Sequence, residues 1–319
     1  MKVGLVTVNL NQPDVTAKSA NFTLSQPCPD LRFVIVDNGS TSENFARLEE
    51  GVRGLAVDLI RLDKPVSPGA AFNLGIKSLA DRCDLVLIQD NDMFTSWDAI
   101  SRMADTLVSF PRLGALSPLI MYYYQRNKIW YAGYKRNFYR GNSSVHPETD
   151  KVDTGKLTRP YTTQIINLSC AMVRSSVFAT VGYLDPLMFG GEEVDFSLRL
   201  IQNGYANAVE PRARAYHIAG TTTRGGTRYI TESSLVGATK YYIRFLQLYC
   251  NSAQIVSSLL YRFITYPREF QNLRSESLLG TARSMWRGAT QMIVEHLQDK
   301  VVVPKRDPEP CGETTKEIS

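Results

Sequence analysis

The sequence contains few of the residues that form covalent and metal cross-links. Only five of its 319 residues are cysteine, and only three are histidine. The cysteines are scattered, odd in number and never spaced as Cys-x-x-Cys. This pattern argues against a disulfide framework and against a structural zinc site. We therefore expect reduced thiols in a cytoplasmic protein.

Long apolar runs are also missing. No stretch of about 18 apolar residues occurs, so we expect no transmembrane helix. Asn9, Asn11 and Gln12 interrupt the first apolar run, and we therefore expect no signal peptide. The absence of Gly-x-x-x-x-Gly-Lys-Ser/Thr excludes a P-loop NTPase. The net charge of +5 is too small to indicate nucleic acid, and no recognition motif accompanies it.

What the sequence does have is a regular alternation of element types over its first 110 residues. Short runs rich in Val, Ile and Leu predict buried strands at 3–8, 32–36, 56–62 and 84–89. The segments between them predict helices at 15–25, 42–51 and 68–79. This alternation is typical of an α/β fold with a mostly parallel sheet that helices cover on both faces.

The second half of this predicted domain is less regular. Residues 112–165 are rich in Tyr, Asn, Arg and Gly, and predict an antiparallel excursion with long loops. After it we predict a strand and helix over 167–180, a loop and helix over 184–203, and a strand over 208–217. We assign residues 1–228 to one catalytic domain.

The C-terminal part is helical in pattern from Glu232 to about Leu297, with a break at Pro267. Twelve Lys/Arg and five Asp/Glu fall between Arg224 and Arg306. A basic amphipathic surface over 233–300 would suit peripheral contact with anionic lipid at the inner face of a membrane. The alternatives are a helical cap on the catalytic domain and an oligomer interface. We assign 229–300 to this helical region and predict a disordered tail at 301–319.

Polar side chains follow three of the predicted strands. They are Asn9, Asp37 and the run Asp90-Asn91-Asp92. Ligands of an open parallel sheet bind beyond the carboxyl ends of its strands, so these side chains can share one crevice. Asp37 can accept a hydrogen bond from the ring N–H of a nucleobase, or it can belong to a plain turn. Asp90 and Asp92 can hold a diphosphate only through a hard divalent cation, and their alternative role is an N-cap.

Further acids stand at the start of a predicted helix. Glu192, Glu193 and Asp195 follow two glycines, and one carboxylate can take the proton from an attacking hydroxyl. The alternative is that they complement the helix dipole. His217 ends the last predicted strand and is either a metal ligand or a packed core residue.

In this order the motifs resemble those of the family 2 glycosyltransferases, most closely the bacterial rhamnosyltransferase-like branch. The resemblance covers about residues 3–225. Its motifs are Asn9, then Val34 to Ser40, Gly69 to Asn73 with Gly75, Asp90 to Asp92, Glu192 to Asp195, and His217.

The resemblance implies a GT-A fold with a C-terminal helical extension. It implies an inverting hexosyltransferase that moves a sugar from a UDP- or dTDP-sugar to a saccharide or lipid-linked acceptor in glycan biosynthesis. The nucleotide would contact Asn9, Asp37, Gly69, Asn73 and Asp90, and Asp92 and His217 would bind Mn²⁺ or Mg²⁺. Glu193 occupies the base position, where the family usually has Asp, with Glu192 and Asp195 as the other acids. Arg224 and Arg228 would cover the diphosphate.

Two other functions fit the same fold class. A nucleotidyltransferase needs a glycine- and arginine-rich loop after the first strand, whereas residues 9–13 read Asn-Leu-Asn-Gln-Pro. A non-catalytic sugar-nucleotide-binding or scaffold protein would lack the acids, all of which are present here. The sequence does not identify the donor sugar, the acceptor or the oligomeric state.

Overall fold

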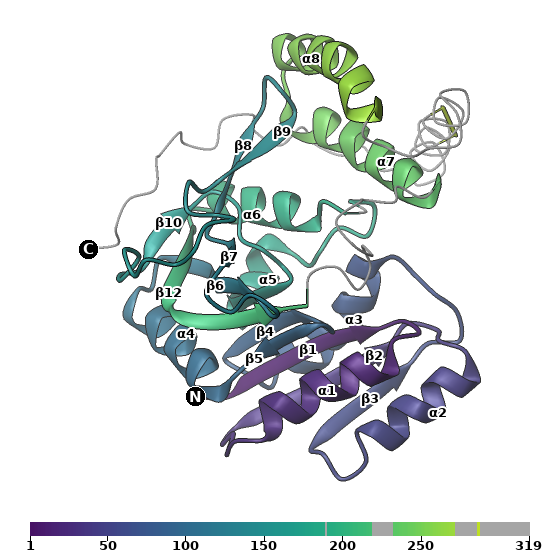
Figure 1. The fold of residues 1–319 in the computed structure, drawn as a ribbon, viewed down its shortest axis with the longest axis vertical. Helices are drawn as coiled ribbons and strands as arrows, with labels where there is room; N and C mark the ends of the chain where they lie inside the picture. Colours follow the sequence, from purple (N-terminus) through teal and green to yellow (C-terminus); the bar gives the residue numbers. More distant parts are fainter. Residues whose placement is uncertain (189, 219–231, 272–285, 288–319) are drawn as a thin grey trace.

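The computed structural model describes residues 1–188, 190–218, 232–271 and 286–287. Its centre is a ten-stranded sheet in the order β10-β12-β6-β11-β4-β1-β2-β3, with β5 paired to β12 and β7 to β6 (Figure 1). Helices lie on both sides of this sheet. The predicted α/β fold with a mostly parallel sheet is confirmed.

The N-terminal half is a parallel sheet. Its strands and helices are β1 (Val3–Asn9), α1 (Pro13–Leu24), β2 (Leu31–Asp37), α2 (Ser42–Gly51), β3 (Val57–Arg61), α3 (Pro68–Ala80) and β4 (Leu85–Asp90). β1 lies between β2 and β4 and pairs with both in parallel register. All seven predicted elements are present, with boundaries within a few residues of those expected.

Successive residues of the central strands enter different cores. Leu5 of β1 belongs to a core that includes residues of α1, α2 and α4, whereas Val6 packs with residues of α3, α5 and α6. The side chains of a strand alternate between the two faces of the sheet, so each face needs its own layer of helices. This explains why these strands read as continuous apolar runs.

The second half differs from the predicted mixture of long loops. Its elements are β5 (Met93–Thr95), α4 (Trp97–Ser109), β6 (Leu113–Tyr122), β7 (Ile129–Tyr131), β8 (Tyr134–Asn137), β9 (Asn142–Val145), β10 (Tyr161–Thr163), β11 (Cys170–Arg174), α5 (Ser175–Val181), α6 (Glu192–Gln202) and β12 (Ala206–His217). The antiparallel excursion exists as the β8–β9 hairpin. β6, however, is a ten-residue buried strand inside the sheet, and the sequence analysis predicted neither β6 nor α4.

Two C-terminal helices follow, α7 (Glu232–Tyr249) and α8 (Ser252–Gln271). The predicted break at Pro267 is wrong, because α8 runs through that residue. The break lies instead at Asn251, which accepts a hydrogen bond from the Gln254 backbone N–H and donates its own backbone N–H to the Gln254 side chain. This reciprocal pair begins α8. The predicted tail at 301–319 lies outside the described residues.

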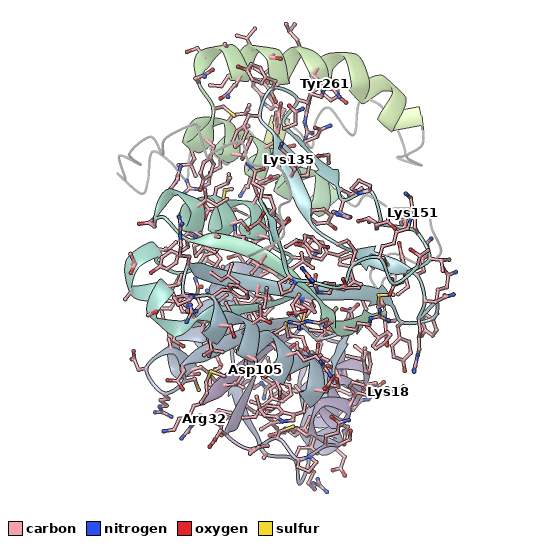
Figure 2. All side chains as sticks on the ribbon, turned by 90° about the vertical axis from the view of Figure 1, so that its left-hand side faces the viewer. Lys18, Arg32, Asp105, Lys135, Lys151 and Tyr261 are labelled. Carbon is pink, nitrogen blue, oxygen red and sulfur yellow. The ribbon has the colours of Figure 1, made fainter. Side chains whose placement is uncertain are left out.

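α7 packs on α6. Tyr242, Phe245 and Tyr249 of α7 share a buried cluster with Val194 and Leu198 of α6. The β8–β9 hairpin contacts α8, since the Arg140 guanidinium lies 5.6 Å from the centre of the Tyr261 ring. Figure 2 shows this end of the molecule, with Tyr261 on α8 above Lys135 on β8. Among the helices described, none is both long enough and apolar enough to cross a membrane.

Candidate active site at the carboxyl ends of β1, β2 and β4

The carboxyl ends of β1 and β2 are joined by a buried network of hydrogen bonds. Asn9 donates to a carboxylate oxygen of Asp37 at 2.7 Å and accepts from the Thr16 hydroxyl at 2.8 Å. The Ser40 hydroxyl donates to the same Asp37 oxygen at 2.6 Å, and its backbone N–H reaches the other oxygen at 3.1 Å. Asp37 is 0% exposed. The structure thus brings the predicted pair Asn9 and Asp37 together and shows that Asp37 also orders the turn after β2.

The glycine of this turn is required by its geometry. Gly39 has a φ of +76°, and a Cβ there would lie 2.5 Å from the backbone carbon of Lys64. The neighbouring Asn38 side chain holds the same loop from the other side, exchanging two hydrogen bonds with the backbone of Val66. The Asp37-Asn38-Gly39-Ser40 run therefore fixes the loop that precedes α3.

Two carboxylates and one imidazole converge at the end of β4. The Nε2 atom of His217 lies 3.1 Å from a carboxylate oxygen of Asp92. One ligand atom from each of Asp90, Asp92 and His217 lies within 4.8 Å of the others. His217 reaches this position because the end of β12 pairs with β5, where it lies opposite Met93. Asn91 points elsewhere and donates to Gln12 and Thr16.

This group fits a hard divalent cation. Burial raises the pKa of Asp90 above its ordinary value, a hydrogen bond from Ser169 lowers it, and the Asp92 carboxylate raises it again. Two acids that disfavour each other's ionised forms, with an imidazole beside them, gain from a shared positive charge. Carboxylate oxygens with one imidazole nitrogen form a donor set that Mn²⁺ accepts, and Mg²⁺ accepts the oxygens.

A cavity of about 420 Å³ opens beside this group. Gly69, Phe72, Asp90, Trp130, Tyr134 and Glu193 are among the residues that line it. The cavity therefore joins the predicted metal site to the predicted acid pair, although Asp90 and Glu193 are far apart in the chain. The Trp130 ring also meets the His217 ring edge to face, with centroids 4.3 Å apart.

The two glutamates of the acid pair have different surroundings. One oxygen of Glu192 accepts hydrogen bonds from the backbone N–H groups of Gly190 and Gly191, at 2.9 and 3.0 Å. Burial raises the pKa of Glu192 to about 7, and these backbone donors oppose the shift. Burial also raises the pKa of Glu193 to about 7, with the Glu192 and Asp90 charges adding to the shift and Arg136 opposing it. Both side chains line the cavity, and Glu192 is the one tied to the backbone.

Three other predicted site residues make contacts within the protein. Asp195 is 0% exposed and binds the Arg199 guanidinium at 2.8 Å and the Tyr249 hydroxyl at 2.6 Å. The Asn73 amide exchanges two hydrogen bonds with the backbone of Leu184, which lies in the loop before α6. Gly69 leaves room for Glu192, because a Cβ there would lie 3.3 Å from the Glu192 Cγ. Arg224 and Arg228 lie outside the described residues.

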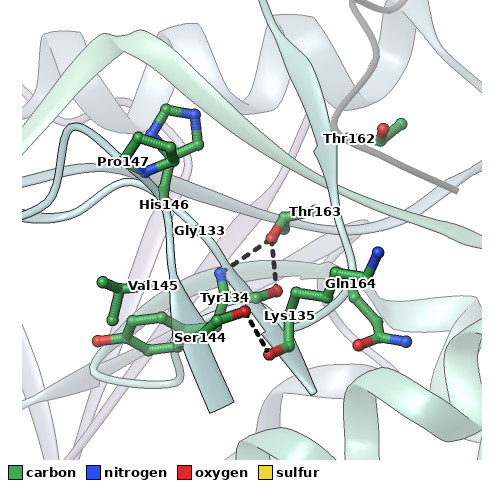
Figure 3. A pocket seen from close by; sticks show the side chains of 10 residues that line it. All are labelled: Gly133, Tyr134, Lys135, Ser144, Val145, His146, Pro147, Thr162, Thr163 and Gln164. Carbon is green, nitrogen blue, oxygen red and sulfur yellow. Dashed lines mark hydrogen bonds between the residues drawn. The ribbon is translucent and has the colours of Figure 1, made fainter. Parts of the chain in front are cut away.

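The fold also brings to the site several residues that no sequence motif predicted. Asn167 and Ser169, which precede β11, line the cavity, as does Tyr134 of β8. Tyr134 also borders a second cavity of about 190 Å³, between the β8–β9 hairpin and residues 162–164 (Figure 3). Thr163 fixes Tyr134 there, since its hydroxyl bonds to both the N–H and the C=O of Tyr134. No local motif marks these residues.

Known proteins share this architecture. The crystal structure of GalNAc-T7 with UDP, GalNAc and Mn²⁺ matches with a TM-score of 0.62 and 15% identity, over 96% of this chain and 58% of that one. The mannosyltransferase PcManGT from Pyrobaculum calidifontis, in complex with GDP-Man and Mn²⁺, matches with a TM-score of 0.52 and 13% identity, over 94% and 88%. TarS 1–349 from S. aureus gives 0.54 and 13%, over 94% and 83%.

At these identities the three matches show the fold alone. This chain also spans less than two thirds of the GalNAc-T7 chain. No curated protein sequence matches it significantly. The sequence model of glycosyl transferase family 2, however, matches residues 5–182, which is more than half of the chain and includes the ends of β1, β2 and β4. The chain therefore belongs to the family 2 glycosyltransferases, with a GT-A fold.

Proposed function

We propose that the protein is a metal-dependent inverting glycosyltransferase that moves a sugar from a nucleoside diphosphate donor, a UDP- or dTDP-sugar, to an acceptor hydroxyl. One observation carries the proposal. Ligand atoms of Asp90, Asp92 and His217 lie within 4.8 Å of one another, and Asp90 lines the same cavity as Glu193. A site for a diphosphate–metal complex thus lies next to a candidate base with a pKa of about 7.

The donor would lie along the carboxyl ends of the strands. Its base and ribose would contact the segment held by Asn9, Asp37 and the Asn38–Val66 loop, with Asp90 beside the ribose. Asp92 and His217 would hold Mn²⁺ or Mg²⁺, which neutralises the charge on the departing diphosphate. The Mn²⁺ in the GalNAc-T7 and PcManGT structures supports this arrangement by analogy.

Glu193 is the proposed general base. A carboxylate whose pKa lies near the working pH is half ionised and still basic enough to accept a proton, which suits general base catalysis. Glu193 takes the proton of the acceptor hydroxyl as the oxygen forms its bond to the anomeric carbon. The bond from that carbon to the diphosphate breaks, and the electron pair leaves with the phosphate oxygen. One such displacement inverts the anomeric centre and needs no covalent sugar–enzyme intermediate.

The acceptor side is formed by residues of the second half of the fold. Trp130 and Tyr134 line the cavity and offer aromatic faces on which a saccharide ring can pack. Val256, Leu259 and Leu260 of α8 are at least half exposed. An exposed apolar row on a helix of a basic region suits peripheral contact with an anionic membrane. We therefore include lipid-linked saccharides among the proposed acceptors.

Calorimetric titration tests the donor site. UDP, dTDP and GDP would be titrated into the protein with and without MnCl₂, and again into Asp92→Asn. We expect binding of UDP or dTDP that requires the metal and that the substitution weakens at least tenfold. Asp98→Asn, an exposed acid paired with Arg102 on α4, is the matched control and should bind like the wild type. Nucleotide binding that neither metal nor Asp92→Asn changes would contradict the metal-dependent site.

A second measurement tests the reaction. The protein would be incubated with Mn²⁺ and a panel of UDP- and dTDP-sugars, including dTDP-rhamnose, and the release of UDP or dTDP would be followed. Proton NMR of the freshly released sugar shows which anomer forms first. Release of the inverted anomer supports the proposal. Nucleotide binding without turnover of any donor, with any acceptor tried, would favour the non-catalytic binding protein instead.

A further inference from the structure

We propose that Arg136 of β8 and Tyr241 of α7 are positioning residues that hold the Glu193 carboxylate in its reactive place and charge state. The inference rests on the proposed function, because it treats Glu193 as the base. It goes further by assigning a role in the active site to the β8–β9 hairpin and to the C-terminal helix α7. The helix lies beyond residues 5–182, which match the family model, and the hairpin carries none of the motifs of the resemblance.

Arg136 is a buried cation held in a fixed place. Its side chain is 7% exposed, one terminal nitrogen donates to the Gly141 carbonyl at 2.7 Å, and the other donates to the Ser143 hydroxyl at 3.3 Å. The guanidinium lies 4.1 Å from the centre of the Phe245 ring. Its Nε atom is also buried and has no hydrogen-bond partner among the described residues. One N–H donor of this buried guanidinium therefore has no acceptor among the described residues.

Tyr241 packs next to the segment that carries the acid pair. Its ring packs directly on Gly191, because a Cβ built on that glycine would lie 2.0 Å from the ring. Gly191 immediately precedes Glu192 and Glu193 in the chain. The Tyr241 hydroxyl is buried and has no hydrogen-bond partner among the described residues. The Arg136 guanidinium lies 5.6 Å from the centre of the same ring.

Buried donors without acceptors cost free energy, and nearly all such groups in proteins find a partner. Arg136 Nε and the Tyr241 hydroxyl are two such donors, and a carboxylate accepts hydrogen bonds only. Glu193 interacts electrostatically with both of them. We infer that Glu193 is the acceptor that these two donors hold when the cavity is filled.

The charges around Glu193 indicate a second role for Arg136 and Tyr241. Burial, the Glu192 charge and the Asp90 charge raise the pKa of Glu193, and Arg136 is the positive group that lowers it. The positive charge of Arg262 on α8 lowers the pKa of Arg136 and that of Tyr241. Burial raises the pKa of Tyr241 to about 12, so its hydroxyl stays protonated and can donate. Arg136 therefore keeps a fraction of Glu193 ionised at neutral pH.

α7 is fixed well enough to position a side chain. Arg244 of α7 binds Asp185 in the loop before α6, with its two nitrogens 2.9 and 2.7 Å from one carboxylate oxygen. Tyr249, five residues further along α7, binds Asp195 of α6. These two contacts tie α7 to both sides of the acid pair. With these contacts α7 would complete the active site. This role corresponds to the helical cap that the sequence left open for residues 229–300.

The test is the pH dependence of donor hydrolysis, with water as the acceptor and with the UDP- or dTDP-sugar that the wild type turns over. Arg136→Met removes the positive charge, so the pKa of Glu193 should rise and the acidic limb of kcat/KM should move up by at least half a pH unit. Arg136→Lys keeps the positive charge, so its acidic limb should stay close to the wild-type position. Tyr241→Phe, which deletes one oxygen atom, should lower kcat at least fivefold and move the limb in the same direction, with little change in the donor KM.

Arg140→Met is the matched control, since Arg140 is exposed, lies in the turn between β8 and β9, and packs on Tyr261 of α8. Its pH profile should be that of the wild type. Wild-type kcat and an unshifted limb in Tyr241→Phe would overturn the proposal, and this variant decides the matter even if Arg136→Met does not fold. An equal loss at every pH in folded Arg136→Met would also overturn it. Failure of the wild type to turn over any donor would instead count against the proposed function.

Discussion

His217 Nε2 lies 3.1 Å from the Asp92 carboxylate, although 125 residues separate them. The contact forms because β12 crosses to the end of the sheet and pairs with β5, directly after Asp92. The Trp130 ring meets the imidazole edge to face, and the pairing with β5 fixes the His217 backbone opposite Met93. An acid that follows β4 and a histidine that ends β12 thus meet at one point, which is where we propose that the metal-bound diphosphate lies.

His217→Ala should weaken Mn²⁺ binding at least tenfold while leaving the fold intact, because the substitution removes one of three converging ligands. Electron paramagnetic resonance of free Mn²⁺ measures the affinity in the presence of UDP. His146→Ala is the control, since His146 lies in the second cavity and bonds to the Glu148 backbone. Equal Mn²⁺ affinity in all three proteins would remove His217 from the metal site.

Substitutions of Glu192 and Glu193 should differ in their effects on kcat and on thermal stability. Glu193→Gln should lower kcat at least a hundredfold with donor affinity unchanged, because the acceptor proton loses its base. At pH 5, where both carboxyls are protonated, Glu192→Ala should lower thermal stability more than Glu193→Ala does, because the truncation leaves the Gly190 and Gly191 backbone donors without their acceptor. Steady-state kinetics and thermal melts of these variants distinguish these roles. A larger loss of kcat in Glu192→Gln than in Glu193→Gln would reverse the assignment.

The buried carboxyl of Glu193 should make stability depend on pH. Its folded pKa of about 7 lies above the ordinary value of 4.5, so the folded protein favours the protonated form. Stability from this group is present at low pH and is lost as the pH rises through about 7. Glu193→Gln removes the loss and should be more stable than wild type by about 3 kcal/mol at pH 8.5, with little gain at pH 4.5. Urea unfolding without metal at both pH values measures it, and a constant difference would contradict the shift.

Asn73 gives a test of a nucleotide contact implied by the family resemblance. In the structure its amide holds the Leu184 backbone, and its side chain is 8% exposed. Asn73→Ala leaves two buried backbone groups without partners and should cost about 1–3 kcal/mol of stability. We expect kcat to fall because the loop before α6 loosens, whereas the Kd for UDP or dTDP stays the same. A Kd raised tenfold or more, measured by calorimetry, would restore Asn73 to the nucleotide site.

The exposed apolar row on α8 should bind anionic membranes. Vesicles of phosphatidylglycerol and phosphatidylcholine should sediment the wild type, and sedimentation should fall in Leu259→Ser/Leu260→Ser and at high salt. A matched double change outside α8, Val108→Ser on α4 with Val145→Ser on β9, also removes two exposed apolar side chains and should keep binding. Equal sedimentation of all three proteins would contradict membrane contact through α8.

The parallel half of the sheet could be predicted because its signals are local. Val34, Ile35 and Val36 form a buried run, and the Asp37-to-Ser40 turn follows it directly. β6 was missed for a physical reason. It is buried along its length, so it lacks the alternation of a half-buried strand, and Pro118 lies within it. The break expected at Pro267 was wrong because Asn251 and Gln254, not the proline, end one helix and begin the next.

The sequence by itself determined the α/β class, the acids at the strand ends and the membership of a sugar-transferring family, since each of these is written in short segments. Only the tertiary structure decided which acids share a site. It joined Asp92 to His217, tied Glu192 to the backbone N–H groups of Gly190 and Gly191, enclosed Asp195 between Arg199 and Tyr249, and packed the Tyr241 ring on Gly191. Those relations depend on the pairing of β12 and the packing of α7 on α6. Such contacts between distant segments leave no periodicity or spacing in the chain.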